Sequence, residues 1–196
     1  MKKTGIFLLV LMLLLSVACN KGETAEQATI NALNAVRTLD KDTLSKYLNY
    51  NDLVKTNEDS NDQESEEQVK KIFENLEYKI VSSEEKDTEA IVKVDITNID
   101  MEKVMGEAMK NALAEAFSQA FSSIGEQKSE EENEDMFSEQ FNQALENNKG
   151  SKVINTVDIK LTKVDGHWKI NMDSDLQNAL MGNLLGVANQ LKEAFE

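Results

Sequence analysis

The sequence feature that most constrains the fold is a change in the spacing of apolar residues after residue 76. Before that point apolar residues recur every three or four positions, which is typical of helices. Between residues 78 and 97 they recur at every second position, as in a strand with one buried face. The clearest alternation sets Ala90, Val92, Val94 and Ile96 against Lys93, Asp95 and Thr97. We therefore predict two strands, over about 78–82 and 90–97, joined by a polar turn at 84–87.

A second hairpin is predicted near the C-terminus. Asp165 and Gly166 lie between two alternating runs, and Asp-Gly in such a setting is a strong signal for a tight turn. The apolar positions are Val153, Val157, Ile159 and Leu161 before the turn and Trp168, Ile170 and Met172 after it. Both hairpins should be antiparallel and bury one face.

Helices are predicted to flank the hairpins. A capping box at 24–27 opens the first helix, and Asp40 caps a shorter second helix that carries Tyr47. A third helix should span about 66–76, after an acidic loop at 57–67. A last helix should begin at Ser174, with one apolar face formed by Leu176, Leu180, Leu184, Leu191 and Phe195.

A helical insertion separates the two hairpins. From Met101 to Ile124 the gaps between apolar residues are one, three or four, which predicts a helix with a broad apolar face. An acidic loop at 126–135 and a second helix around Phe137–Leu145 complete the insertion at about 101–148. Segregated helices and antiparallel strands predict one α+β domain over residues 24–196.

The N-terminus resembles the signal sequence of bacterial lipoproteins. Lys2 and Lys3 precede the apolar run 6–15, which is shorter than the roughly 20 residues of a membrane span. The run ends at Leu15-Ser16-Val17-Ala18-Cys19, similar to a lipobox, with Ser16 where the family usually has Leu. The resemblance implies a signal peptide over residues 1–18, cleavage between Ala18 and Cys19, and lipidation of Cys19 by diacylglyceryl and palmitate. An ordinary secretory signal is the alternative.

The lipobox resemblance implies a place in the cell. The lipid on Cys19 would hold the protein on the extracytoplasmic face of the cell membrane. Residues 19–23 would form a tether that reaches about 15 Å at roughly 3.3–3.6 Å per residue. The domain should therefore lie close to the bilayer.

Composition excludes several function classes. A formal net charge of -15 argues against nucleic acid as a partner. One Cys and one His rule out a disulfide within the chain and a thiolate or multi-histidine metal site, so we expect neither metal nor cofactor. The acidic runs at 57–67 and 126–135 lack the pattern of an EF-hand loop, and we interpret them as solvated.

The chain also resembles uncharacterised bacterial lipoproteins with a nuclear-transport-factor-2-like (cystatin-like) fold. The residues that carry the resemblance are Leu39-Asp40, Tyr47-Leu48, Asp165-Gly166, Trp168-Lys169-Ile170, Ala179-Leu180 and Gly182. The resemblance covers most of residues 24–182. It implies a curved antiparallel sheet packed by the N-terminal helices, with a cone-shaped cavity.

Few residues could carry chemistry in such a cavity. Tyr47, Tyr50, Tyr78 and Trp168 could line it, although aromatic residues of this kind more often pack in the core. His167 could act as a general base, but the alternation places it opposite Trp168 and toward solvent. The alternation also places Asp95 away from the apolar face, toward solvent.

Two functions remain open from the sequence. The first is a non-catalytic binding module for a small apolar ligand or a partner protein of the cell envelope. The alternative is an isomerase- or dehydratase-like enzyme that uses a carboxylate or the His with a Tyr inside the cone. The insertion could be a lid that closes one end of the cone or an arm that binds a partner, and we predict the lid.

Overall fold

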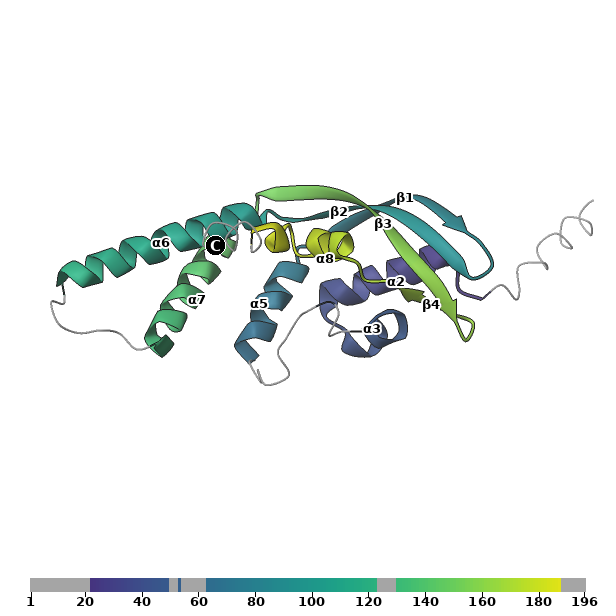
Figure 1. Ribbon diagram of the computed structural model, residues 1–196, viewed down its shortest axis with the longest axis horizontal. Helices are drawn as coiled ribbons and strands as arrows, with labels where there is room; N and C mark the ends of the chain where they lie inside the picture. The colour runs from purple at the N-terminus through teal and green to yellow at the C-terminus, as the bar shows by residue number, and fades with distance from the viewer. Residues whose placement is uncertain (1–21, 50–52, 54–62, 123–129, 188–196) are drawn as a thin grey trace, which may run out of the picture.

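The computed structural model describes residues 22–49, 53, 63–122 and 130–187, and its fold class is α+β (Figure 1). The predicted signal peptide, Ala18, Cys19 and Tyr50 therefore lie outside the described residues. The helices are α2 (Ala25–Thr38), α3 (Lys41–Tyr47), α5 (Gln63–Phe73), α6 (Met101–Ser122), α7 (Glu130–Asn147) and α8 (Ser174–Leu180). The strands are β1 (Glu77–Glu85), β2 (Glu89–Ile99), β3 (Lys152–Val164) and β4 (His167–Ile170).

The strands form one antiparallel sheet in the order β1-β2-β3-β4, which contains both predicted hairpins. β2 pairs along its whole length with β3, from Glu89 opposite Thr162 to Ile99 opposite Lys152. β4 is short and pairs only with residues 161–164 of β3. The described sheet is open, and the cone implied by the family resemblance is not seen in it.

The predicted Asp-Gly hairpin is confirmed. Asp165 and Gly166 both have positive φ, at 50° and 82°, as a two-residue type I′ turn requires. Val164 pairs with His167 across the turn, so Trp168 lies opposite Lys163 with its side chain on the buried face.

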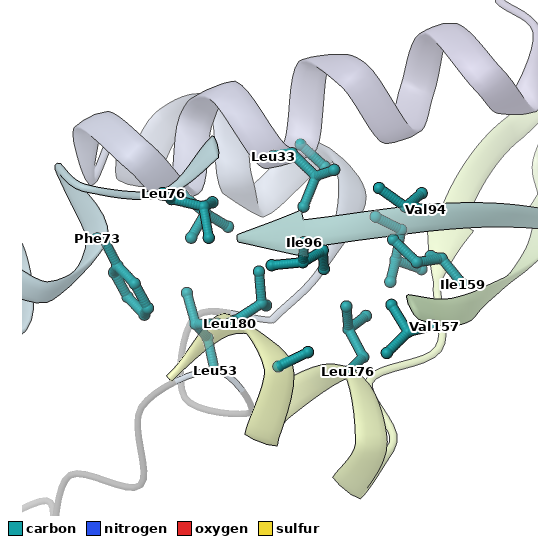
Figure 2. Close-up of a cluster of buried hydrophobic side chains, with 14 of the residues drawn as sticks. Leu33, Leu53, Phe73, Leu76, Val94, Ile96, Val157, Ile159, Leu176 and Leu180 are labelled. Carbon is teal, nitrogen blue, oxygen red and sulfur yellow. The ribbon is translucent and has the colours of Figure 1, made fainter. Parts of the chain in front are cut away.

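The helices α2, α3, α5 and α8 all lie on one face of the sheet (Figure 1). Both predicted caps are confirmed: Thr24 accepts a hydrogen bond from the amide of Gln27, and Asp40 accepts one from Thr43. The core forms where these helices meet the inner face of β2 and β3. Figure 2 shows the side chains of Leu33, Leu76, Ile96, Ile159, Leu176 and Leu180 converging there, and all are at most 2% exposed.

The insertion forms a helical hairpin of α6 and α7 that we call the arm. Its root is docked, because Met101, Val104 and Leu145 are fully buried. The far half of α6 extends beyond the end of the sheet rather than over it (Figure 1). The prediction of a lid is therefore wrong for this half.

The acidic stretches are more helical than predicted. α5 already begins at Gln63 and α7 at Glu130, so parts of the runs at 57–67 and 126–135 are helix rather than loop. Acidic residues stabilise the first turn of a helix, because the unpaired amide groups there carry partial positive charge.

The prediction of a single long C-terminal helix is also wrong. α8 ends at Leu180, and positive φ values at Gly182 and Asn183 turn the chain. Leu191 and Phe195 lie outside the described residues.

Gly182 joins the C-terminal segment to the root of the arm. Its carbonyl oxygen accepts a hydrogen bond from the amide of Met101, the first residue of α6, at 2.9 Å. Its φ is +59°, and a Cβ at this position would collide with the carbonyl oxygen of Ile99. Glycine is therefore required both by the backbone angle and by the close approach of β2.

Candidate functional site

Trp168 is a core residue that also holds the start of the domain. Its side chain is 1% exposed, and its indole Nε1 donates a hydrogen bond to the backbone carbonyl of Glu23 at 3.1 Å. The ammonium group of Lys163 lies 4.4 Å from the centroid of the ring, on the neighbouring strand. A buried indole N–H needs an acceptor, and here the acceptor comes from Glu23, two residues before α2 begins.

Tyr47 reaches the same residue from α3. Its hydroxyl donates to Glu23 Oε1 at 2.7 Å, and Asn31 Nδ2 donates to the same Oε1 at 2.6 Å and to the Tyr47 hydroxyl at 3.2 Å. We call Glu23, Asn31, Tyr47 and Trp168 the Glu23 clamp. The clamp joins α2, α3 and β4 to Glu23, the last residue of the predicted tether.

The clamp is poorly suited to proton transfer. Burial raises the pKa of Tyr47, and its hydrogen bond to Glu23 raises the pKa further. The hydroxyl is therefore a weaker acid than a free tyrosine, and its proton is already directed at a carboxylate. The geometry suits a structural junction better than an acid–base pair.

The other aromatic and titratable candidates lie apart from the clamp. Tyr78 is half-buried on β1, opposite Ile96, and packs against the core. His167 is exposed at the start of β4, as predicted. Asp95 lies on the outer face of β2, where its carboxylate accepts a hydrogen bond from the Thr156 hydroxyl at 2.7 Å.

Two hollows are open to solvent, and polar side chains dominate both. One, of about 420 Å³, lies between α2 and α3 and includes Asn34, Arg37, Lys46 and Tyr47. The other, of about 450 Å³, lies between β3 and α8 and has Asn155 among its lining residues. The sequence analysis missed this second hollow because α8 follows β3 across a turn and a further strand, so the pattern of neither element reveals their proximity.

The far half of α6 carries an apolar stripe that nothing described covers. Leu113 is 57% exposed and Phe117 is 65% exposed, with Ala116 between them. The two larger residues are four positions apart, so they lie on the same side of the helix. On another side of α6, Glu107 and Glu115 accept hydrogen bonds from side chains of α7 and of Asn148, the residue after it. The stripe therefore belongs to a face of the arm that α7 leaves open.

Within the part of the chain that the structure describes, no group of three or more His, Cys, Asp and Glu side chains could hold a metal ion. In the same part, no helix combines the length and apolar character that crossing a bilayer requires.

Comparison with known proteins gave one similar structure. No protein-family model matches the chain, and no curated protein matches it. The similar structure is the crystal structure of "a putative lipoprotein (ycdA) from Bacillus subtilis subsp. subtilis str. 168", with 18% sequence identity and a TM-score of 0.41. The match covers 87% of this chain and 53% of the other, so this chain spans about half the length of the structure that it matches. A TM-score of 0.41 is too low to assign a common fold.

Proposed function

We propose that this chain is a lipid-anchored protein of the cell envelope that binds a partner protein through the arm. The observation that carries the proposal is the exposed stripe of Leu113, Ala116 and Phe117. Large apolar side chains grouped on one helix face are characteristic of surfaces that bind another protein. The proposal includes no catalytic activity.

The position of the arm relative to the anchor supports this proposal. Cys19 precedes Glu23 by four residues, so the lipid would lie within about 15 Å of the Glu23 clamp. α2 starts at one end of the molecule, and the tip of α6 lies at the other (Figure 1). A protein anchored in this way would present the stripe away from its own attachment point.

A partner protein fits the surface better than a small apolar ligand. Ligand sites for apolar molecules are concave and lined mainly by apolar side chains. The two hollows between α2 and α3 and between β3 and α8 are polar instead. The proposal includes a relationship to the nuclear-transport-factor-2-like lipoproteins. It is supported by the arrangement of helices on one face of an antiparallel sheet.

The proposal is tested by crosslinking in intact cells. A photoreactive amino acid replaces Phe117 in one variant and Val81 in a matched variant, because Val81 is also apolar and half exposed but lies on β1. We expect a discrete crosslinked protein only from position 117, and its loss when Leu113→Ser is added. The added change should leave the circular dichroism spectrum unchanged, because the side chain is exposed.

Equal crosslinking from both positions, or none from position 117, would contradict a binding role for the arm. A crosslink between two copies of the chain would replace the proposed partner with self-association.

A further inference from the structure

Half of β3 is an open sheet edge. The amide of Lys163 donates to the carbonyl of Thr88, the residue before β2. The carbonyl of Lys160 accepts from the amide of Asn171, which lies on the side of β3 away from β2. Backbone groups alternate in direction along a strand, so even-numbered residues of β3 point away from β2. β4 occupies this side only from residue 161 onward. The N–H and C=O groups of Ile154, Thr156 and Asp158 therefore face no strand within the described residues.

An unsatisfied amide lies beside this edge. Asn155 Nδ2 is buried and has no hydrogen-bond partner among the described residues. Asn155 has the same parity as Val157 and Ile159, so its side chain lies on the inner face of the sheet, toward α8. A buried amide without a partner is destabilising, and such groups are rare in folded proteins. The Asn155 amide is therefore a hydrogen-bond donor that a bound ligand could satisfy.

The hollow between β3 and α8 runs along the same edge. Asp175 and Asn178 of α8 line one side, and residues 155–158 of β3 line the other. Lys160 is paired with Asp173 at 3.0 Å, and Lys93 with Asp158 at 3.3 Å. The charges cancel within each pair, which leaves Asp175 as the lining carboxylate that forms no ion pair among the described residues. The hollow is thus an edge groove with one excess negative charge.

The opposite edge of the sheet lacks these features. β1 carries an irregularity in its pairing between Ile80 and Ser82 and ends in the charged pair Glu84 and Glu85. Bulges and charges of this kind prevent the edge of a sheet from pairing with other strands. On β3, in contrast, Ile154 is 66% exposed at the open edge.

We propose that the open edge of β3, residues 154–158, binds an extended peptide segment of another protein as an added strand. Only another strand offers alternating N–H and C=O groups that match those of residues 154, 156 and 158. The segment would place a hydrogen-bond acceptor opposite Asn155 and a basic side chain toward Asp175. A net charge of -15 on the whole chain also favours a basic segment. This site is separate from the arm and does not depend on its function.

The test uses the full chain in detergent micelles and a labelled peptide, acetyl-Val-Lys-Val-Asn-Val-amide. In antiparallel pairing its Asn lies opposite Asn155 and its Lys opposite Val157, facing α8. Fluorescence polarisation measures the affinity, and hydrogen exchange read by mass spectrometry locates the bound peptide. We expect slow exchange to appear at the outward amides of residues 154, 156 and 158 only when the peptide is present, because the amides of 155 and 157 already pair with β2.

Three variants separate this site from nonspecific binding. Thr156→Pro removes one outward N–H and none of the backbone hydrogen bonds to β2, together with the hydroxyl that donates to Asp95, and should weaken binding roughly threefold to tenfold. Asn155→Leu should weaken binding similarly while raising the melting temperature, because it removes the unsatisfied amide. Asp175→Asn should abolish the preference for the Lys peptide over a peptide with Glu in its place. A peptide with Pro as the central residue is the negative control.

Three results would overturn the proposal. Protection of the amides of residues 154, 156 and 158 in the peptide-free chain would show that the edge is already covered. Equal binding of the Pro control, or unchanged affinity in both Asn155→Leu and Asp175→Asn, would place the peptide elsewhere. If Thr156→Pro fails to fold, those two variants decide the outcome, since neither side chain takes part in the backbone pairing of the sheet.

Discussion

Trp168→Ala should destabilise the domain more than any surface substitution. The indole is 1% exposed, and removing a side chain of this size from a core costs about 3–5 kcal/mol. The hydrogen bond to the Glu23 carbonyl is lost as well, which contributes about 1 kcal/mol and leaves that carbonyl without its indole donor. We therefore expect a total loss of about 4–6 kcal/mol, against roughly 5–15 kcal/mol for the stability of a whole domain.

Urea unfolding measures this loss. With a slope of about 2 kcal/mol per molar urea, a loss of 4 kcal/mol lowers the midpoint by about 2 M. Circular dichroism must report the transition, because Trp168 is the single tryptophan of the chain. Trp168→Phe keeps most of the packing but not the N–H donor, and should cost about 1–2 kcal/mol.

His167→Ala is the matched control, because His167 is adjacent on β4 but exposed. It should change stability by less than about 0.5 kcal/mol. A midpoint for Trp168→Ala within about 0.5 M of the wild-type value would refute the reasoning, because the indole could then be neither buried nor bonded to the start of the domain.

Three further predictions concern the anchor and two titratable groups. Cys19→Ala should abolish the lipid mass and release the protein from membranes, which mass spectrometry and fractionation measure; a variant that stays membrane-bound would contradict the lipobox. Asp173→Ala should cost about 1 kcal/mol in urea melts, because Asp173 caps α8 by accepting from the amide of Leu176 at 3.0 Å. That hydrogen bond lowers the pKa of Asp173 below 3.8, so the advantage of wild type should persist above that pH and vanish in stronger acid. Burial raises the pKa of Tyr47 above 10.0, so wild type should lose stability relative to Tyr47→Phe as the pH rises past 10, and parallel curves would argue against a buried hydroxyl.

The sequence predicts the sheet well because the relevant signals are local. The alternation through β2 and the Asp165-Gly166 turn each lie within a few consecutive residues, and both determine the pairing directly. The caps at Thr24 and Asp40 are local for the same reason. Such patterns do not reveal where the elements pack, so the direction of the arm could not be inferred from the apolar face of α6.

The contacts of the candidate sites join residues that are far apart in the sequence. The Glu23 clamp brings a residue before α2 against Trp168 on β4, and no pattern near either residue indicates that contact. The edge of β3 is free because β4 is too short to cover it, and the length of β4 could be estimated from the sequence. The unpaired amide of Asn155 could not, because it depends on the position of α8.

The hydrogen bond from the amide of Met101 to the carbonyl of Gly182 holds the first residue of α6 in place. A rotation of the arm would therefore have its pivot at this residue. α6 has 22 residues and is therefore roughly 33 Å long at 1.5 Å per residue. A rotation of about 10° at this pivot would move the far end of α6 by roughly 6 Å, about the pitch of one helical turn. Phe117 lies 16 residues from Met101, about 24 Å along the helix, so the same rotation would move it by roughly 4 Å.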